Sequence, residues 1–386
     1  MSVLQHRVKE LLRPPYRFFR DPIVRRWRRL AIRRELRDQT HARPTYVVGF
    51  STWKEYLRKY FPDRRLILLP REITEAEFHS TYKAPILSHP HAEIFIWGFK
   101  APAFIFDFIA KHGVKVMFVE DGFVRSAGLG ATKEPPRSLC MDSRTPYFNA
   151  REASDLETLL NTCDFSVHPG LLDRADAAID LILKTGVSKY NHARPVSVTR
   201  AYGPKNSERV LVLGQVEDDA SILFGCSTPL TNNDAVRLAA QEHPDAQIIY
   251  KPHPDVLQGH RPNQSNPDDV RHLCLILQED MPLAQALETI DHVYTITSLG
   301  GFEALLRGLK VTTLGAPFYS GWGLTGDRQA IERRTRRLTV REVFAAAYLL
   351  YPSYFDPDTG HQVELEDVVS RLSSRQSLAA GGEAGT

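Results

Sequence analysis

At 386 residues the chain is long enough for two domains, and its 42% hydrophobic and 25% charged content is that of a soluble globular protein. Its net charge is only +3, and it holds no apolar run of about 18 residues, so we expect neither a spanning helix nor, at its start, a signal peptide. Four cysteines without CxxC spacing argue against a disulfide scaffold and favour the reducing cytoplasm.

The first 38 residues are strongly basic, with 12 Lys+Arg against 4 Asp+Glu. Apolar residues, Trp27 among them, recur at helical spacing between the arginines. Basic helices with an apolar face suit an anionic membrane surface. We therefore predict that residues 1–40 associate with the inner face of the cytoplasmic membrane. A solvated arm without a partner is the alternative, and nucleic acid is not expected because no nucleic-acid motif accompanies the arginines.

Residues 41–165 alternate between short apolar runs and helical segments, which predicts a Rossmann-like first domain. The expected strands are 46–50, 66–69, 94–97 and 115–119. The last strand runs into Glu120 and Asp121, with Arg125 and the glycine-rich 128–130 just beyond. Acidic residues at the carboxyl end of a parallel strand are candidate site residues. A structural Glu–Arg pair is the alternative interpretation.

The same alternation returns after a helical linker, which we place at 166–207. The second Rossmann-like domain is predicted at 208–335, with strands at 209–214, 248–251, 273–277, 293–296 and 311–314. Closing helices are expected at 336–372 and a disordered tail at 373–386. The predicted fold class is therefore α/β. Two Rossmann-like domains with a cleft between them form the GT-B arrangement of glycosyltransferases.

The strand 209–214 is followed by Gln215 and then by three carboxylates, Glu217, Asp218 and Asp219. Crowded carboxylates repel one another unless a cation or a substrate compensates them. A solvated acidic turn with Asp219 as the N-cap of the next helix is the alternative. No metal is expected, because adjacent acidic side chains diverge and the neighbouring motifs already supply cationic groups for a phosphate.

Two further motifs point to that phosphate. In the sequence KPHPD, prolines hold Lys251 and His253 on a rigid corner after a strand, although a simple strand-ending turn would look alike. In TSLGG, Ser298, Gly300 and Gly301 lie between a strand and a helix start, where amide groups and the helix dipole favour anions. Neither GxGxxG nor a P-loop lysine is present. A nucleoside-monophosphate sugar donor fits this pattern better than a dinucleotide.

Six motifs in order carry a family resemblance: FSTWK, VEDGFVRSAGLG, GQVEDDASI, YKPHPD, TSLGGFEALLRG and YSGWGLTGDR. From about residue 45 to 370 the chain resembles the KpsC-type capsule-polysaccharide β-Kdo transferases. The resemblance implies a retaining enzyme that moves Kdo from CMP-Kdo to a lipid-linked or glycan acceptor, without a cofactor. KpsC-type proteins usually carry two such modules, whereas each motif occurs once here. A second Kdo transferase and the capsule export machinery are the further partners that the resemblance implies.

The resemblance also implies roles for particular residues. Asp219 would be the nucleophile, with Asp218 as the fallback, and Glu120 the acid/base on the acceptor hydroxyl. The phosphate of departing CMP would be stabilised by His253 together with Ser298, Gly300 and Gly301.

Other residues would surround the donor. The Kdo carboxylate would be bound by Arg125, with help from Lys251. Glu303 would reach the ribose, Tyr319 or Trp322 would border the nucleotide, and Asp121 and Gln215 are secondary candidates. A sialyltransferase-like enzyme that uses CMP-sialic acid and a non-catalytic membrane-associated assembly factor are the alternative functions.

Overall fold

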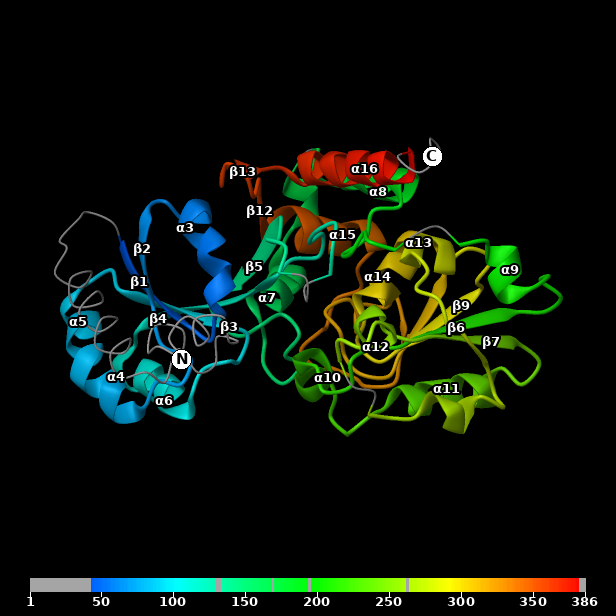
Figure 1. Cartoon of the computed structure of the whole chain (residues 1–386), viewed down its shortest axis with the longest axis horizontal. Coiled ribbons are helices and arrows are strands. Elements are labelled where there is room, and N and C mark those ends of the chain that lie inside the picture. Colours follow the sequence, from blue (N-terminus) through cyan, green and yellow to red (C-terminus); the bar gives the residue numbers. More distant parts are fainter. Residues whose placement is uncertain (1–42, 130–132, 169, 194–195, 262–263, 382–386) are drawn as a thin grey trace, which may run out of the picture.

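The computed structural model describes residues 43–129, 133–168, 170–193, 196–261 and 264–381, which form two α/β domains (Figure 1). The basic segment 1–40 lies outside the described residues, so its membrane association stays a prediction. Among the described helices, none is long and apolar enough to cross a membrane.

Four parallel strands begin the first domain: β1 (Arg43–Val48), β2 (Arg64–Leu68), β3 (Glu93–Trp97) and β4 (Lys115–Asp121). Their apolar residues are buried because helices cover both faces of the sheet. The helices of this domain are a 3-10 turn (Thr52–Tyr56), α3 (Leu57–Tyr60), α4 (Glu75–Thr81), α5 (Lys83–Ser88) and α6 (Ala103–His112). In Figure 1, α3 lies on one face and α4, α5 and α6 lie on the other.

Three strands that the sequence analysis did not predict complete this sheet: β5 (Ser138–Asp142), β12 (Pro352–Phe355) and β13 (Gln362–Val363). They are antiparallel, and the full order is β13-β12-β5-β4-β3-β1-β2. The chain therefore returns to the first sheet after it has built the second domain. The predicted closing helices at 336–372 are thus interrupted by two strands.

The second domain is a parallel sheet of six strands: β6 (Arg209–Leu213), β7 (Gln247–Lys251), β8 (Leu275–Ile276), β9 (His292–Thr295), β10 (Lys310–Thr313) and β11 (Gly326–Asp327). The order is β11-β10-β9-β6-β7-β8. The chain therefore adds β7 and β8 on one side of β6 and then adds β9, β10 and β11 on the other side, which makes a topological switch point between β6 and β9. The helices are α10 (Ala220–Gly225), α11 (Asn232–Glu242), α12 (Pro254–Leu257), a 3-10 turn (Pro267–Val270), α13 (Leu283–Ala286) and α14 (Leu299–Leu306). Helix α11 packs on one face, and α13 and α14 on the other.

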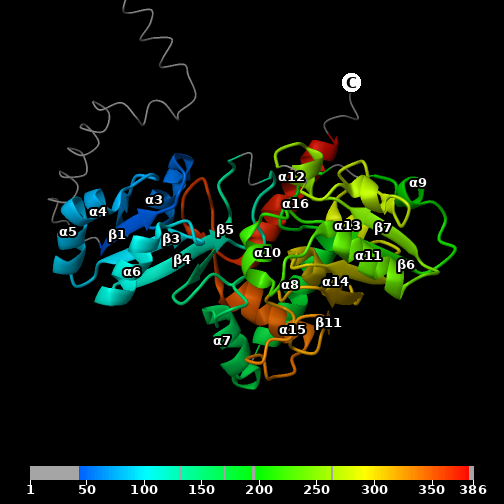
Figure 2. The same cartoon turned by 90° about the horizontal axis from the view of Figure 1, so that it is seen from below.

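Helices outside the two sheets join the domains. They are α7 (Asp155–Thr162), a 3-10 turn (Phe165–Val167), α8 (Leu171–Thr185), α9 (Val198–Tyr202), α15 (Val340–Phe344), a π-helix (Ala345–Leu350) and α16 (Leu365–Gly381). Helix α16 continues to Gly381, whereas the sequence predicted a disordered tail from residue 373. Two views place α10 where the domains meet (Figure 1, Figure 2).

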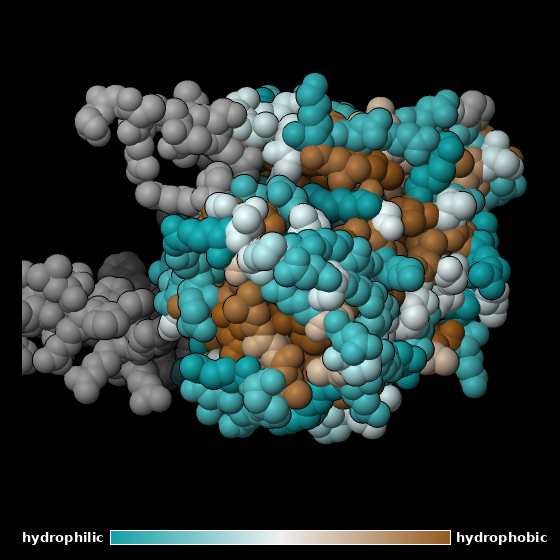
Figure 3. Space-filling model, turned by 90° about the vertical axis from the view of Figure 1, so that its right-hand side faces the viewer, coloured by the Kyte–Doolittle hydropathy of each residue, from teal (hydrophilic) through white to brown (hydrophobic). Residues whose placement is uncertain are grey.

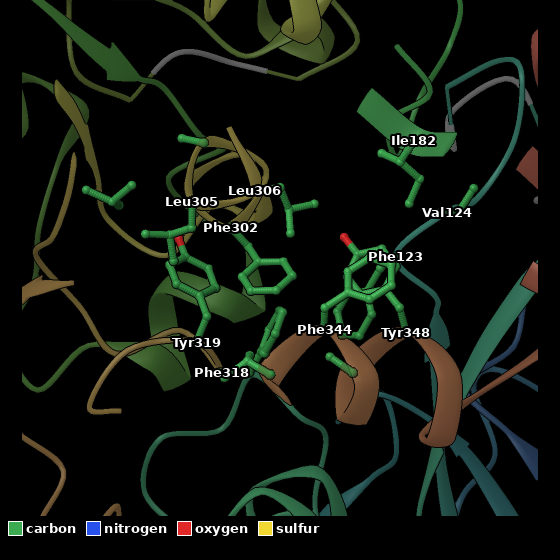
Figure 4. Packing of buried hydrophobic residues seen from close by; sticks show 14 of the residues in the cluster. Phe123, Val124, Ile182, Phe302, Leu305, Leu306, Phe318, Tyr319, Phe344 and Tyr348 are labelled. Carbon is green, nitrogen blue, oxygen red and sulfur yellow. The ribbon is translucent and has the colours of Figure 1, made fainter. Parts of the chain in front are cut away.

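One hydrophobic cluster spans both domains (Figure 4). Phe123 follows β4 of the first domain, and its ring lies 4.8 Å from Phe318 of the second domain and 5.3 Å from Tyr348 of the π-helix. Phe302 of α14 lies 5.4 Å from Phe318. Burying aromatic rings from four segments in one cluster stabilises the junction beside the site described below.

The surface is mixed in polarity. In the space-filling view, hydrophobic patches alternate with hydrophilic ones on the outer face of the second domain (Figure 3). The large hydrophobic side chains that are exposed among the described residues lie on separate elements: Leu87, Val167, Leu223, Leu275 and Leu350. Scattered exposure of this kind is normal for a protein surface.

Candidate active site

A cavity of about 530 Å³ opens between the two domains. The ends of β3 and β4 form its first-domain wall, and the residues after β6, β7 and β9 form its second-domain wall. Segment 188–193 of the passage between the domains supplies a third side. Because strand order reverses between β6 and β9, the cavity lies where open α/β sheets bind ligands.

The first two carboxylates after β6 have structural partners. Glu217 is buried and accepts the amide N–H groups of Asn232 and Ser265, each at 2.7 Å. It therefore holds the acidic turn against neighbouring loops. Asp218 is exposed on the cavity wall and pairs with Arg261. Two of the three acids are thus already engaged.

Asp219 lies on the same wall and is exposed. It is also the N-cap of α10, since its Oδ1 accepts the Ser221 amide at 2.9 Å. Asp219 is therefore an N-cap, as the alternative interpretation of the sequence predicted, and it also lines the cavity. The capping hydrogen bond holds its carboxylate in position there.

Glu120 reaches the cavity from the first domain. Burial, and then the adjacent Asp121 charge, raise the pKa of Glu120 to about 7. Gly98, just after β3, makes room for it, because a Cβ at this position would collide with Glu120 Oε1. A carboxyl group that gains and loses its proton near neutral pH suits general acid–base chemistry.

Asp121 and Arg125 form a buried pair behind that wall. Arg125 Nε donates to Asp121 Oδ2 at 2.7 Å, and its Nη1 donates to Ser126 Oγ at 2.7 Å. Burial opposes ionisation of Asp121, but the Arg125 guanidinium lowers the pKa of this carboxyl below its usual value. Arg125 is only 1% exposed and is not part of the cavity wall, although Asp121 is. The sequence left open a structural pair between Glu120 and Arg125. The structure shows a structural pair, but Arg125 forms it with Asp121.

The KPHPD corner places the side chains of Lys251 and His253 on the opposite wall. His253 caps α12, and its Nδ1 accepts the Asp255 amide at 3.1 Å. An accepting Nδ1 leaves the ring proton on Nε2, and burial lowers the pKa of His253. The neutral ring therefore offers one N–H donor. Lys251 is buried, and its Nζ lies 3.4 Å from Asp280 Oδ1.

The TSLGG turn caps α14. Ser298 Oγ accepts the Gly300 amide at 3.2 Å, and its carbonyl accepts the Gly301 amide at 3.1 Å. The amides of both glycines are thus already hydrogen-bonded within the turn. Ser298 and Gly300 line the cavity, whereas Gly301 packs beneath it, where a Cβ would collide with the Tyr319 hydroxyl.

Comparisons with known proteins place the chain in a family. The family model for a capsule polysaccharide biosynthesis protein matches residues 92–354. The chain belongs to this family. It is 44% identical to the lipopolysaccharide-processing protein LpsZ of Rhizobium meliloti, over 85% of this chain and 73% of LpsZ. It is 38% identical to the capsule polysaccharide modification protein LipA of Neisseria meningitidis serogroup B, over 86% of this chain but only 46% of LipA.

Solved structures agree with this family assignment. The β-Kdo 2,4 transferase of Thermosulfurimonas dismutans KpsC matches with a TM-score of 0.73 and 33% identity, over 86% of this chain and 99% of that chain. The β-Kdo 2,7 transferase of the same KpsC matches with a TM-score of 0.66 and 29% identity, over 86% of this chain and 99% of that chain. The predicted KpsC-type resemblance and the GT-B fold class are confirmed.

Of four further predicted site residues, two line the cavity and two are buried beneath its lining. Gln215 lines it and ties β6 to β9, because its Oε1 accepts the Thr297 amide at 2.7 Å. Glu303 also lines it, and its Oε1 accepts the Ser188 hydroxyl at 2.7 Å. Tyr319 and Trp322 are fully buried and are not part of the cavity wall. Their side chains donate to the carbonyls of Ser298 and Phe318 and so support its floor.

Lys189 and Lys54 are among the lysines near the cavity that had no predicted role. Lys189 lines the cavity from a polar passage that carries no motif. Lys54 stands in the FSTWK motif and is buried against the face of Trp97, close enough to Glu120 for their charges to interact. Its place in that motif was the only sequence signal available for either residue.

One group of metal-ligand type lies elsewhere among the described residues. The ligand atoms of Glu208, His243 and His292 lie within 4.8 Å of one another. Glu208 and His292 stand at the amino ends of β6 and β9, the sheet edge opposite the cavity, and His243 is the C-cap of α11. The expectation that the reaction needs neither a metal nor a cofactor therefore stays a prediction for the cavity itself.

Proposed function

We propose that the chain is a β-Kdo glycosyltransferase that moves Kdo from CMP-Kdo to a lipid-linked or glycan acceptor in capsule or surface polysaccharide biosynthesis. One observation carries the proposal. A single cavity brings Glu120 of the first domain together with Asp219 and His253 of the second. The fold around it matches both β-Kdo transferases of KpsC.

The donor phosphate is assigned to the second-domain wall. His253 presents an N–H at Nε2, because its Nδ1 is occupied by the Asp255 amide. That donor, with the Ser298 hydroxyl beside it, stabilises the phosphate charge that develops as CMP leaves. Glu303 is assigned to the ribose.

Transfer with retention of configuration takes two displacements. First, an Asp219 oxygen attacks the anomeric carbon of Kdo, the bond from that carbon to the phosphate oxygen breaks, and CMP departs with the electron pair. The product is a Kdo–Asp219 ester. Second, ionised Glu120 takes the proton of the acceptor hydroxyl, the acceptor oxygen attacks the same carbon, and the Asp219 carboxylate leaves.

Incubating the full-length protein with CMP-Kdo and a panel of lipid-linked Kdo acceptors tests this function. We expect sustained CMP release only when an acceptor is present, and a β-Kdo product with retained configuration by NMR linkage analysis. CMP-sialic acid is the control donor, and its sugar should not be transferred. An inverted product would contradict the two-step mechanism, and absence of CMP release with every acceptor would contradict the function.

The place of action is proposed from residues 1–40, which lie outside the described residues. Their basic and apolar composition suits the anionic inner face of the cytoplasmic membrane. Deleting residues 1–38 should abolish sedimentation with anionic liposomes and spare transfer to a soluble acceptor. Unchanged liposome binding would reject this assignment.

A further inference from the structure

Segment 188–192 binds both domains through successive residues. On the first-domain side, the Lys189 carbonyl accepts the amides of Arg125 and Ser126 at 3.2 and 3.4 Å. On the second-domain side, Ser188 Oγ donates to Glu303 Oε1 at 2.7 Å, and His192 Nε2 lies 2.7 Å from Asp280 Oδ2.

Asn191 locks the segment further. Its amide donates to the Ala127 carbonyl at 3.0 Å, and its Nδ2 donates to the Ser126 carbonyl at 3.0 Å. Its Oδ1 accepts the Ser188 amide at 2.9 Å. The segment is therefore a fixed wall of the cavity, and Lys189 stands at a set position in that wall.

Lys189 is one of the cationic residues that line the cavity. Asp121 of the first domain and Asp219 of the second both act on its charge, and it acts in turn on Glu120 and His253. Burial opposes its ionisation, but Tyr190, Tyr147, Asp121 and Asp219 together raise the pKa of Lys189 above its usual value. At neutral pH the two tyrosines are uncharged, so Asp121 and Asp219 are the neighbours in this set that favour the ammonium form. Among the described residues, no carboxylate lies within ion-pair distance of it.

The other cations near the cavity are already engaged. Arg125 is bound by Asp121 behind the wall, Lys251 faces Asp280, and Arg261 pairs with Asp218. Lys54 is buried against Trp97. Lys100 remains on the first-domain side, beside Glu120. Among these cations, Lys189 is the one whose charge is influenced by both Asp121 and Asp219, and it has no ion pair with a described residue.

We propose that Lys189 binds the carboxylate of the donor sugar and thereby selects sugar acids of the 2-keto type over neutral aldoses. This inference rests on the proposed function. The carboxylate of such a sugar is attached to the anomeric carbon that Asp219 attacks, so a group that binds it must lie near Asp219. A charged hydrogen bond there also offsets the repulsion between the attacking carboxylate and the substrate's own.

This assignment replaces the role that the sequence gave to Arg125 and Lys251. Arg125 instead acts through Asp121, as a positioning residue on the first-domain side. Lys251 acts through Asp280, which it shares with His192.

Calorimetric titration with CMP and with CMP-Kdo separates the sugar carboxylate from the nucleotide. The background is full-length Asp219→Asn, which keeps an oxygen for the α10 cap and does not consume the donor. In this background, Lys189→Met and Lys189→Gln should bind CMP within about threefold of the parent but CMP-Kdo at least about tenfold more weakly. Lys189→Arg should restore most of the affinity for CMP-Kdo. Lys100→Met is the matched control and should leave the ratio of the two affinities unchanged.

The possible outcomes separate a failure of the Lys189 inference from a failure of the proposed function on which it rests. If the Asp219→Asn parent gains no affinity from the Kdo group, the proposed function fails, whatever Lys189 does. If the parent prefers CMP-Kdo and the Lys189 variants keep that preference, the inference is wrong. Equal losses for CMP and CMP-Kdo would also overturn it, since they would place Lys189 at the phosphate. Using Met and Gln together with melting curves separates a folding defect from a loss of binding.

Discussion

Acidic residues lie at or after the carboxyl ends of two strands on opposite sides of the cavity, and the two groups differ in burial and in their partners. At the end of β4, Glu120 and Asp121 are held among buried neighbours, with the pKa of Glu120 raised to about 7 and that of Asp121 lowered by Arg125. After β6, Glu217 is buried in hydrogen bonds, whereas Asp218 and Asp219 are exposed.

The difference matches the two kinds of chemistry proposed for them. A general acid–base group needs a pKa near the working pH, and burial beside another carboxylate supplies it. A carboxylate nucleophile must instead be reachable by the substrate, and Asp219 is exposed on the cavity wall. In the buried group, Arg125 lowers the pKa of Asp121, and the charge on Asp121 in turn helps to raise the pKa of Glu120. In the exposed group, separate partners leave only Asp219 to the cavity.

The largest expected effect is on the exposed side. Asp219→Ala should lower transfer at least about 10⁴-fold, since removing a nucleophile abolishes the covalent step. Asp218→Ala is the matched control; it loses only the Arg261 pair and should stay within about threefold of wild type. Rates of CMP release and of glycan formation measure both. The reverse pattern would move the nucleophile to Asp218.

The next effect is on the buried side. Glu120→Gln should slow the second displacement by roughly 10²- to 10⁴-fold, because no base then takes the acceptor proton. The first displacement should continue, so intact-mass spectrometry should show the protein with one added Kdo, and peptide mapping should place it on Asp219. The double variant with Asp219→Ala should carry no adduct. An adduct on any other residue would keep the mechanism and reject the assignment.

A smaller effect tests how Glu120 is positioned. Gly98→Ala should lower turnover by roughly tenfold to a hundredfold, because the new methyl group displaces the Glu120 carboxyl. Gly113→Ala is the matched control. Gly98 and Gly113 have φ values of +49° and +62°, but a Cβ at Gly113 would meet nothing within 4 Å. Equal losses in both variants would show that backbone strain, and not the contact with Glu120, is responsible.

The smallest effect is the pH dependence of wild-type transfer. Glu120 must be ionised to act as the base, and its pKa is raised to about 7. Acceptor transfer should therefore rise about tenfold from pH 6 to pH 8 and then level off. Rates measured with a saturating donor give the midpoint. A midpoint close to the ordinary carboxyl value would show that the buried pair does not tune Glu120 as inferred.

Much of the fold was predictable because its strands are buried on both faces. Continuous apolar runs such as 210–213 and 94–97 indicate parallel strands directly. Strands β5 and β12 were missed because SLCMD and PSYF are short, mixed in polarity and far apart in sequence. Their pairing is a tertiary contact that no local pattern reports.

The candidate site was predictable where residues stand directly at strand ends. Glu120, Asp219 and His253 follow parallel strands, and the cavity collects all three. Arg125 shows the limit of this reasoning. Its position four residues after Asp121 predicts proximity to the site. Only the three-dimensional arrangement shows that the guanidinium pairs with Asp121 and does not line the cavity. Lys189 stands in a polar passage whose sequence does not distinguish it from a linker.

The return of β12 and β13 to the first sheet also has a consequence for the order of synthesis. The Tyr351 hydroxyl donates to Asp142 across 209 positions of sequence, and Phe355 stacks on Tyr60 at 4.3 Å. A ribosome delivers the amino-terminal half first, so the open edge of β5 must wait for its partner until the second domain has been made. During that interval the nascent chain presents an unpaired strand, the kind of edge that recruits other chains. Closure of the first sheet therefore has to wait until the second domain has been synthesised.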